Sequence, residues 1–98
     1  GVMSADPLDT LRQEIDRLDA ELLALLARRL DVCQKIALYK RDAVIPMMQT
    51  GRVQQVKERA KHLAASYGID ETFISKIYDL IIAEACRLED RIIEKEQS

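Results

Sequence analysis

The sequence predicts an all-α protein of three helices, one of them very long. Only three Gly and two Pro occur in 98 residues, which leaves too few turn signals for a strand-rich fold. Helix-favouring residues such as Leu, Ala, Glu, Lys and Arg are abundant, and 48% of the chain is apolar, enough for one hydrophobic core. Apolar residues also recur at alternating steps of three and four in three stretches, the spacing of helices that bury one face. We expect residues 1–98 to form a single domain.

The first predicted helix extends from Pro7 to Arg41 or Asp42. Asp6 is a favourable N-cap, and Pro is favoured at the first helical position that follows it. No helix-breaking residue occurs before Pro46. The apolar seam of this helix consists of Leu11, Ile15, Leu18, Leu22, Leu25, Val32 and Ile36.

The length of this helix predicts a homodimer. About 35 residues at ~1.5 Å each extend over roughly 52 Å, whereas a compact domain of this size has a diameter of about 34 Å. The helix would therefore extend beyond its own domain with an apolar seam on its surface, and such a seam is an association surface. A second copy of the chain is the simplest cover, because closed two-fold dimers are the commonest oligomers.

Two shorter helices are predicted after a loop over residues 47–51. The second helix ends at Gly68, a residue type common just after a helix C-terminus, and Asp70 caps the third. The tails, residues 1–5 and 95–98, are expected to be disordered. The apolar seams are Val53, Val56, Ala60, Leu63 and Tyr67 in the second helix, and Ile74, Ile77, Ile81, Ala85, Leu88 and Ile92 in the third.

The composition argues against several classes of function. The net charge is −2, and neither end of the chain is strongly basic, so nucleic-acid binding is not expected. No apolar run reaches the roughly 18 residues of a membrane span. The first residues lack the charged and apolar regions of a signal peptide, which predicts a cytoplasmic protein. Cys33 and Cys86 lack the spacing of a metal or redox motif, so we expect two buried thiols outside any disulfide and no metal site.

Cations interrupt the apolar seam of the first helix. Arg29 lies in the seam, where it is costly to bury unless an anion meets it. Lys40 follows eleven residues later, within roughly 20° on the same face, so the two cations form a candidate anion site. Arg12 lies about 100° around and some 25 Å away, so it can join this site only from an antiparallel partner chain. Arg52 lies at the start of the second helix, where exposed N–H groups also favour anions.

Glu89 lies beside the apolar seam of the third helix, so we expect partial desolvation to raise its pKa. Ordinary surface charge is an equally simple interpretation of this carboxyl group. The same interpretation applies to individual basic residues, and the lone His62 fits a surface position better than a catalytic one. The basic residues concerned are Arg28, Arg29, Arg41 and Lys57.

The chain resembles the AroQ-class chorismate mutases over nearly its whole length. The stretch DPLDTLRQEIDRLDAELLALLARRLDVCQKIALYK is similar to the long first helix of that family, with its two Arg and a Lys eleven residues after the second. IPMMQTGRV is similar to the loop and the following Arg, and YDLIIAEACRLED to the third helix. The resemblance implies an intertwined homodimeric helical bundle with two sites, each completed by the first Arg of the other chain.

The resemblance also implies roles for individual residues. Arg29, together with Arg12 from the partner chain, would hold two substrate carboxylates. Lys40 would donate to the ether oxygen and a carboxylate, and Arg52 would add positive charge at the enolpyruvyl end. Glu89 would face the ether oxygen. The implied reaction is the [3,3] rearrangement of chorismate to prephenate, which needs positioning and electrostatic stabilisation but no nucleophile, metal or cofactor.

Two positions differ from the common family pattern. Family members that act on chorismate often have an acidic residue after the fourth cation and another three residues before it, where this chain has Val53 and Gln49. Both residues, with Ala85, are expected to contact the substrate. The stretches IPMMQTGRVQQVKERA and IIAEACRLED resemble the branch from antibiotic pathways that rearranges 4-amino-4-deoxychorismate. Alternatives are an isochorismate-pyruvate lyase of the same fold, which Val53 also resembles, and a catalytically silent binding or regulatory domain.

Overall fold

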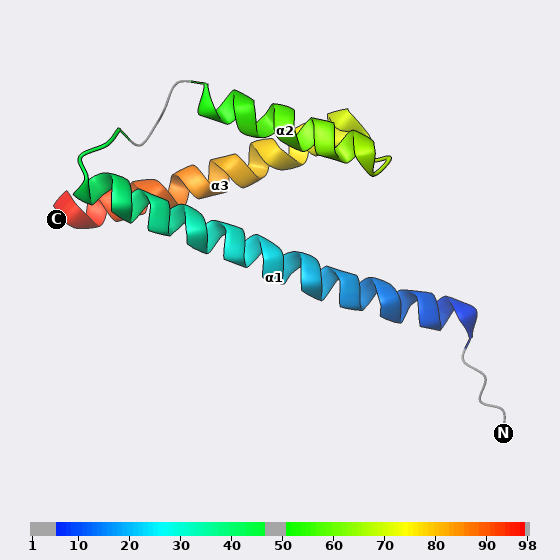
Figure 1. Cartoon of the computed structure of the whole chain (residues 1–98). Coiled ribbons are helices and arrows are strands. Elements are labelled where there is room, and N and C mark those ends of the chain that lie inside the picture. Colours follow the sequence, from blue (N-terminus) through cyan, green and yellow to red (C-terminus); the bar gives the residue numbers. More distant parts are fainter. Residues whose placement is uncertain (1–5, 47–50, 98) are drawn as a thin grey trace. The chain divides into compact units, whose positions relative to one another are not determined.

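The computed structural model describes residues 6–46 and 51–97, and within them every regular element is a helix. The helices are α1 (Pro7–Asp42), α2 (Arg52–Ser66) and α3 (Glu71–Gln97) (Figure 1). The all-α prediction is therefore confirmed. The chain divides into two compact units, Gly1–Val32 and Cys33–Ser98, and α1 runs through both. The prediction of a single domain stays a prediction.

Helix α1 begins and ends where the sequence predicts. The carboxylate of Asp6 accepts a hydrogen bond from the backbone N–H of Leu8 at 3.0 Å, as an N-cap does. The predicted seam is on the surface of the chain rather than in a core, since its members before residue 26 are each 55–63% exposed. Those members are Leu11, Ile15, Leu18, Leu22 and Leu25. A single chain thus leaves a long apolar stripe open to solvent.

The buried core of the described residues is made of small side chains. Ala37 is fully buried, Ala64 is 4% exposed, and Ala60 and Ala85 are 9% and 7% exposed. No large side chain among the described residues is fully buried. Since alanine buries little apolar area, this core supplies only a small part of the hydrophobic stabilisation that a domain of this size needs.

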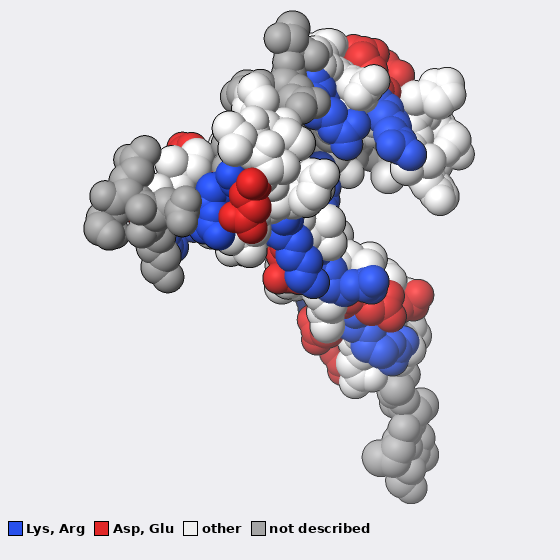
Figure 2. Space-filling view, turned by 60° about the vertical axis from the view of Figure 1, so that its left-hand side comes forward, with Lys and Arg blue, Asp and Glu red and all other residues white. Residues whose placement is uncertain are grey.

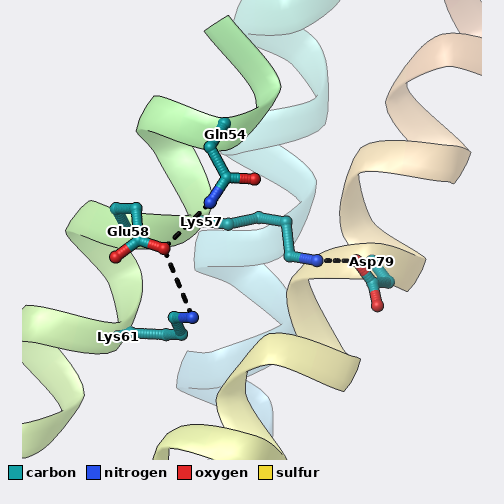
Figure 3. A network of polar contacts seen from close by, with 5 residues as sticks. All are labelled: Gln54, Lys57, Glu58, Lys61 and Asp79. Carbon is teal, nitrogen blue, oxygen red and sulfur yellow. Dashed lines mark hydrogen bonds and ion pairs between the residues drawn. The ribbon is translucent and has the colours of Figure 1, made fainter. Parts of the chain in front are cut away.

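Helices α2 and α3 pack side by side and run antiparallel (Figure 1). The buried alanines of α2, at positions 60 and 64, are one turn apart and let the two backbones approach. An ion pair of 2.6 Å joins Lys57 to Asp79 across the two helices. Glu58 lies next to it on α2, where it accepts a hydrogen bond from Gln54 at 2.9 Å and pairs with Lys61 at 3.3 Å (Figure 3).

The observed boundaries of α2 and α3 agree with those predicted from the sequence at three of the four helix ends. Gly51 precedes α2 with a φ of 82°, and the carboxylate of Asp70 caps α3 by accepting from the N–H of Phe73 at 2.9 Å. Helix α3 continues to Gln97, three residues beyond the predicted end, because Glu, Lys and Gln sustain helical hydrogen bonding. The predicted tails at residues 1–5 and 98, and the predicted site residue Gln49, lie outside the described residues.

Helices α1 and α2 end in the same backbone motif with different residues in the left-handed position. After α2, the N–H of Ile69 donates to the carbonyl of Ala64, and the reversal is made by Gly68 with a φ of 72°. After α1, the N–H of Ile45 donates to the carbonyl of Lys40, and the reversal is made by Val44 with a φ of 56°. A β-branched residue is strained in this conformation.

No helix in the described part of the chain is both long and apolar enough to cross a membrane. The cytoplasmic location predicted from the sequence stays a prediction.

Replacing Val44 with Gly is expected to raise the free energy of unfolding by about 1 kcal/mol, because Gly adopts the left-handed conformation without the Cβ clash. Val44→Ala keeps a Cβ and is the matched control, with an expected change below about 0.5 kcal/mol. The measurement is urea unfolding followed by circular dichroism at one fixed protein concentration. A Gly variant no more stable than the Ala variant would show that residue 44 is not strained.

Candidate active site

Lys40 and Glu89 come together from two helices within residues 33–98. Lys40 lies in the last turn of α1 and Glu89 in the C-terminal half of α3, and both are half-buried. Burial raises the pKa of the Glu89 carboxyl, the positive charge of Lys40 lowers it, and the neighbouring Asp90 raises it. The net effect is a raised pKa, so desolvation outweighs the nearby cation. This is the direction that the position of Glu89 beside the apolar seam predicts.

Two thiols lie close to this pair. Cys33 on α1 and Cys86 on α3 are half-buried, not fully buried as the sequence predicts, and neither forms a disulfide. The pKa of the Cys86 thiol is raised chiefly by burial, and further by the charges of Glu89, Asp90 and Cys33. The thiols are therefore neighbours across the two helices. The sequence analysis overlooked this proximity, although Cys33 shares a helix face with Lys40 and Cys86 precedes Glu89 by about one turn.

The surroundings of Glu89 on α3 are mostly small and apolar. Ala85, four residues before it, is buried, and its predicted contact with the substrate stays a prediction. Ile92, three residues after it, is half-buried. A carboxyl group beside such neighbours loses part of its hydration, which agrees with its raised pKa.

Arg52 and Val53 occupy the first turn of α2, as predicted. The guanidinium of Arg52 is exposed and donates to the side-chain carbonyl of Gln55 at 3.2 Å, and Val53 is 37% exposed. The charges that act on Glu89 are those of Lys40 and Asp90. That Arg52 and Val53 lie close to Lys40 and Glu89 therefore stays a prediction.

The two arginines predicted on α1 lie within the unit Gly1–Val32. Arg12 is exposed and Arg29 is half-buried. Partial burial of a guanidinium fits the position of Arg29 in the apolar seam. Their approach to the substrate stays a prediction.

Arg41 and Lys57, which the sequence analysis also interprets as ordinary surface charges, have acidic neighbours. Arg41 pairs with Asp42 at 3.2 Å, and Lys57 pairs with Asp79 at 2.6 Å. Basic and acidic side chains are interspersed with uncharged ones on the face drawn in Figure 2. His62 is exposed, as expected of a surface residue. Among the residues that the structure describes, no three side chains of His, Cys, Asp or Glu gather as ligands for a metal ion.

The amino-acid sequence matches a known family. Residues 11–90 match the family described as chorismate mutase type II, which covers more than half of the chain. The chain belongs to the chorismate mutase type II family. It is a chorismate mutase-type isomerase, and the site built around Lys40 and Glu89 is interpreted in that light.

Individual relatives carry two kinds of name, 4-amino-4-deoxychorismate mutase and chorismate mutase. The chain is 48% identical over 89 residues to 4-amino-4-deoxychorismate mutase of Streptomyces venezuelae. The aligned stretch covers 91% of this chain and 86% of the relative. The chain is 49% identical over 90 residues to 4-amino-4-deoxychorismate mutase of Streptomyces pristinaespiralis, covering 92% of this chain and 70% of the relative. Chorismate mutase of Methanocaldococcus jannaschii is 26% identical over 93 residues, covering 95% and 94% of the two chains.

The Lys40–Glu89 pair predicts opposite pKa changes in two variants. Lys40→Met should raise the pKa of Glu89 further, because it removes the cation that favours the carboxylate, whereas Asp90→Asn should lower it. NMR titration of the Glu89 carboxyl group measures both. Lys76→Met, which removes an exposed cation near the other end of α3, is the matched control and should have no effect. An unchanged pKa in Lys40→Met would show that the two groups do not interact.

Proposed function

We propose that this enzyme rearranges 4-amino-4-deoxychorismate to 4-amino-4-deoxyprephenate, as a homodimer with two sites. The observation that supports this substrate is the 48–49% identity over 89–90 residues to two relatives named for it, whereas relatives named for chorismate match at 26% over 93 residues or at 43% over only 56 residues. Val53 is consistent with it. Its apolar side chain cannot accept a hydrogen bond from the C4 hydroxyl of chorismate or from a 4-amino group, so Val53 marks a departure from the chorismate pattern without itself selecting the amino compound.

The reaction places particular demands on the protein. One C–O bond breaks and one C–C bond forms within a single substrate, so the protein supplies no nucleophile and no base. It holds the dianion in the folded conformation and stabilises negative charge that develops on the ether oxygen. Lys40 provides a cation at that oxygen. Glu89 contributes only when protonated, because a carboxylate would repel the oxygen that a carboxylic acid can donate to.

The raised pKa of Glu89 supports this assignment. Burial favours the protonated form of Glu89, although Lys40 acts in the opposite direction. Binding of a doubly negative substrate would add negative charge beside Glu89 and remove water. Both changes favour the protonated acid, so the substrate itself helps to prepare the donor.

We propose that the two carboxylates of the substrate are held by arginines of both chains. Arg29 and Arg52 of one chain and Arg12 of its partner suit this role, because a guanidinium binds a carboxylate with two parallel hydrogen bonds. The exposed apolar seam of α1 supports the dimer, since pairing with a second copy would cover it. Gln49, Val53 and Ala85 complete the proposed contacts.

The substrate assignment predicts a clear order of activity. Offered 4-amino-4-deoxychorismate, chorismate and isochorismate separately, the enzyme should convert the 4-amino compound with kcat/KM at least about tenfold above that for chorismate. Arg29→Ala should lose most of this activity, and the adjacent Arg28→Ala is the matched control that should keep it. Mass spectrometry identifies the products. Pyruvate and salicylate from isochorismate alone would indicate a lyase, and turnover of none would indicate a binding domain.

Glu89 predicts the pH dependence of the reaction. Because the protonated form is the active one and the pKa of Glu89 is raised, kcat of the wild-type enzyme, followed over about pH 5 to 8, should fall with rising pH. Glu89→Gln keeps a donor that does not titrate, so its kcat should be independent of pH over that range. The measurement is kcat at saturating substrate. A wild-type profile that is flat, or that Glu89→Gln does not alter, would refute this role.

The shared site predicts recovery of activity on mixing two inactive variants. Arg12→Ala and Arg29→Ala dimers should each be nearly inactive. If the chains exchange, a mixed dimer has one site with both arginines and one with neither, so an equal mixture should regain about one quarter of wild-type activity. Arg29→Ala mixed with the double variant Arg12→Ala/Arg29→Ala is the control and should regain none. Absence of recovery after complete subunit exchange would mean that Arg12 does not act across the interface.

A further inference from the structure

The C-terminal cap of α1 closes on Lys40. The N–H of Ile45 donates to the carbonyl of Lys40 at 2.8 Å. The N–H of Val44 donates to the carbonyl of Arg41 at 3.3 Å. These two bonds, from the sixth residue to the first and from the fifth to the second, define a Schellman motif. Lys40 is therefore the helical residue on which the cap closes, and Ile45 is the residue that closes it.

Val44 makes this closure at a conformational cost that its own side chain does not offset. Its φ of 56° lies in the left-handed region, which disfavours a branched side chain. That side chain is 89% exposed, so it gains little by packing. The reversal places Ile45 against the last turn of α1, and Ile45 is half-buried whereas the following Pro46 is exposed. Burial of an apolar side chain in the cap thus falls to Ile45.

The cap of α2 is the same motif without a functional residue in it. There the N–H of Ile69 donates to the carbonyl of Ala64 at 2.9 Å, and the reversal is made by Gly68. In such a motif, an apolar side chain at the position of Ile69 commonly packs on the residue whose carbonyl accepts the bond. That residue is an alanine in the cap of α2 and Lys40 in the cap of α1. Two isoleucines therefore hold equivalent positions, of which only Ile45 adjoins a candidate site residue.

We propose that Ile45 is a positioning residue, whose side chain packs on the methylene stem of Lys40 and so fixes the direction of its ammonium group. The inference rests on the proposed function, because the role of Lys40 at the ether oxygen is assigned there. Lys40 is half-buried, as expected of a lysine whose stem is covered while its charged end stays accessible. The stem of a lysine is flexible, and covering it reduces the number of rotamers that the side chain can adopt.

A fixed direction of the Lys40 ammonium group matters more in the transition state than in the substrate complex. Negative charge develops on the ether oxygen only as the C–O bond breaks, and a donor that is already in place stabilises this charge without reorganisation. A lysine that has to be ordered during the reaction loses part of that stabilisation as conformational entropy. Loss of the Ile45 side chain should therefore lower kcat more than it raises KM.

The experiment compares Ile45→Ala with the matched control Ile69→Ala in the full-length enzyme. Both variants remove the same atoms from the same cap position, and urea unfolding measures the loss of stability in each. With the chorismate relative that the wild-type enzyme converts fastest, kcat should fall about tenfold in Ile45→Ala, whereas KM should rise less than about twofold. In Ile69→Ala, kcat should stay within about twofold of wild type. Equal kcat in the two variants would overturn the proposal.

The conservative variant Ile45→Leu separates packing on Lys40 from a need for isoleucine itself. Leucine restores an apolar side chain of the same size, so it should recover most of the kcat that Ile45→Ala loses. In the Lys40→Met background, Ile45→Ala should lower kcat less than about twofold further, because the group that Ile45 positions is gone. A further tenfold loss in that background would show that Ile45 does not act through Lys40.

A measurement without substrate tests the packing directly. NMR relaxation of the isotope-labelled Cε of Lys40 reports how restricted the end of its side chain is on the picosecond to nanosecond timescale. The order parameter should fall in Ile45→Ala and stay at the wild-type value in Ile69→Ala and Ile45→Leu. An unchanged order parameter in Ile45→Ala would overturn the proposal even if kcat fell. Failure of the wild-type enzyme to convert any chorismate relative would instead refute the proposed function, and the order parameter would still decide whether Ile45 packs on Lys40.

Discussion

The structure depends on one constraint, which is that a single chain cannot cover its own longest helix. Helix α1 comprises 36 residues, and the leucines and isoleucine of its N-terminal seam remain more than half exposed. Among the residues that the structure describes, the buried side chains are those of alanines. Hydrophobic stabilisation scales with the apolar area removed from water, so most of the area available to this sequence is still uncovered in one chain. In the homodimer that we propose, a second chain would bury the apolar seam of α1. The same pairing would place Arg12 of one chain at the site of the other.

The α2–α3 pair shows how the remaining unit is held with little apolar burial. Small side chains allow close packing, and the Lys57–Asp79 ion pair joins the helices where one partner is partly shielded from water. The sharp turn between them depends on Gly68 in a left-handed conformation and on the Asp70 cap directly after it. These local features set the direction of α3. They therefore also set the position of Glu89, about five turns further along α3, where the charge of Lys40 acts on it.

The sequence predicts the helices well because their determinants are local. Spacing of apolar residues and the caps at Asp6 and Asp70 depend only on near neighbours, and they place most helix ends within a residue. Two features escaped prediction. The chain reverses direction just before Pro46, and Val44 takes the left-handed conformation there. Glycine is the residue usually found in that conformation after a helix. The proximity of Cys33 and Cys86 depends on how two helices cross, which no spacing within either helix can specify.

The candidate site was predictable in part for the same reason. That Glu89 lies beside an apolar seam follows from its position on one helix, and the raised pKa follows from that burial. That Lys40 is its neighbour requires the crossing of α1 and α3, and only the family resemblance pointed to it. The arginines on residues 1–32 need a further step, because their proposed contacts involve a second chain. A contact is harder to predict from the sequence when it depends on the packing of two helices, and harder still when it depends on a second chain.

The balance at Glu89 connects the fold to the chemistry. A cation beside a carboxyl group ordinarily keeps it ionised, and Lys40 acts in that direction here. Burial raises the pKa of Glu89 by more than Lys40 lowers it. In the proposed reaction, the cation of Lys40 and the protonated acid of Glu89 could therefore both act on the ether oxygen. This balance depends on the partial burial of Glu89, beside which Ala85 is buried one turn earlier on α3. In the function that we propose, the protonated form of Glu89 therefore depends on how this part of α3 is shielded from water.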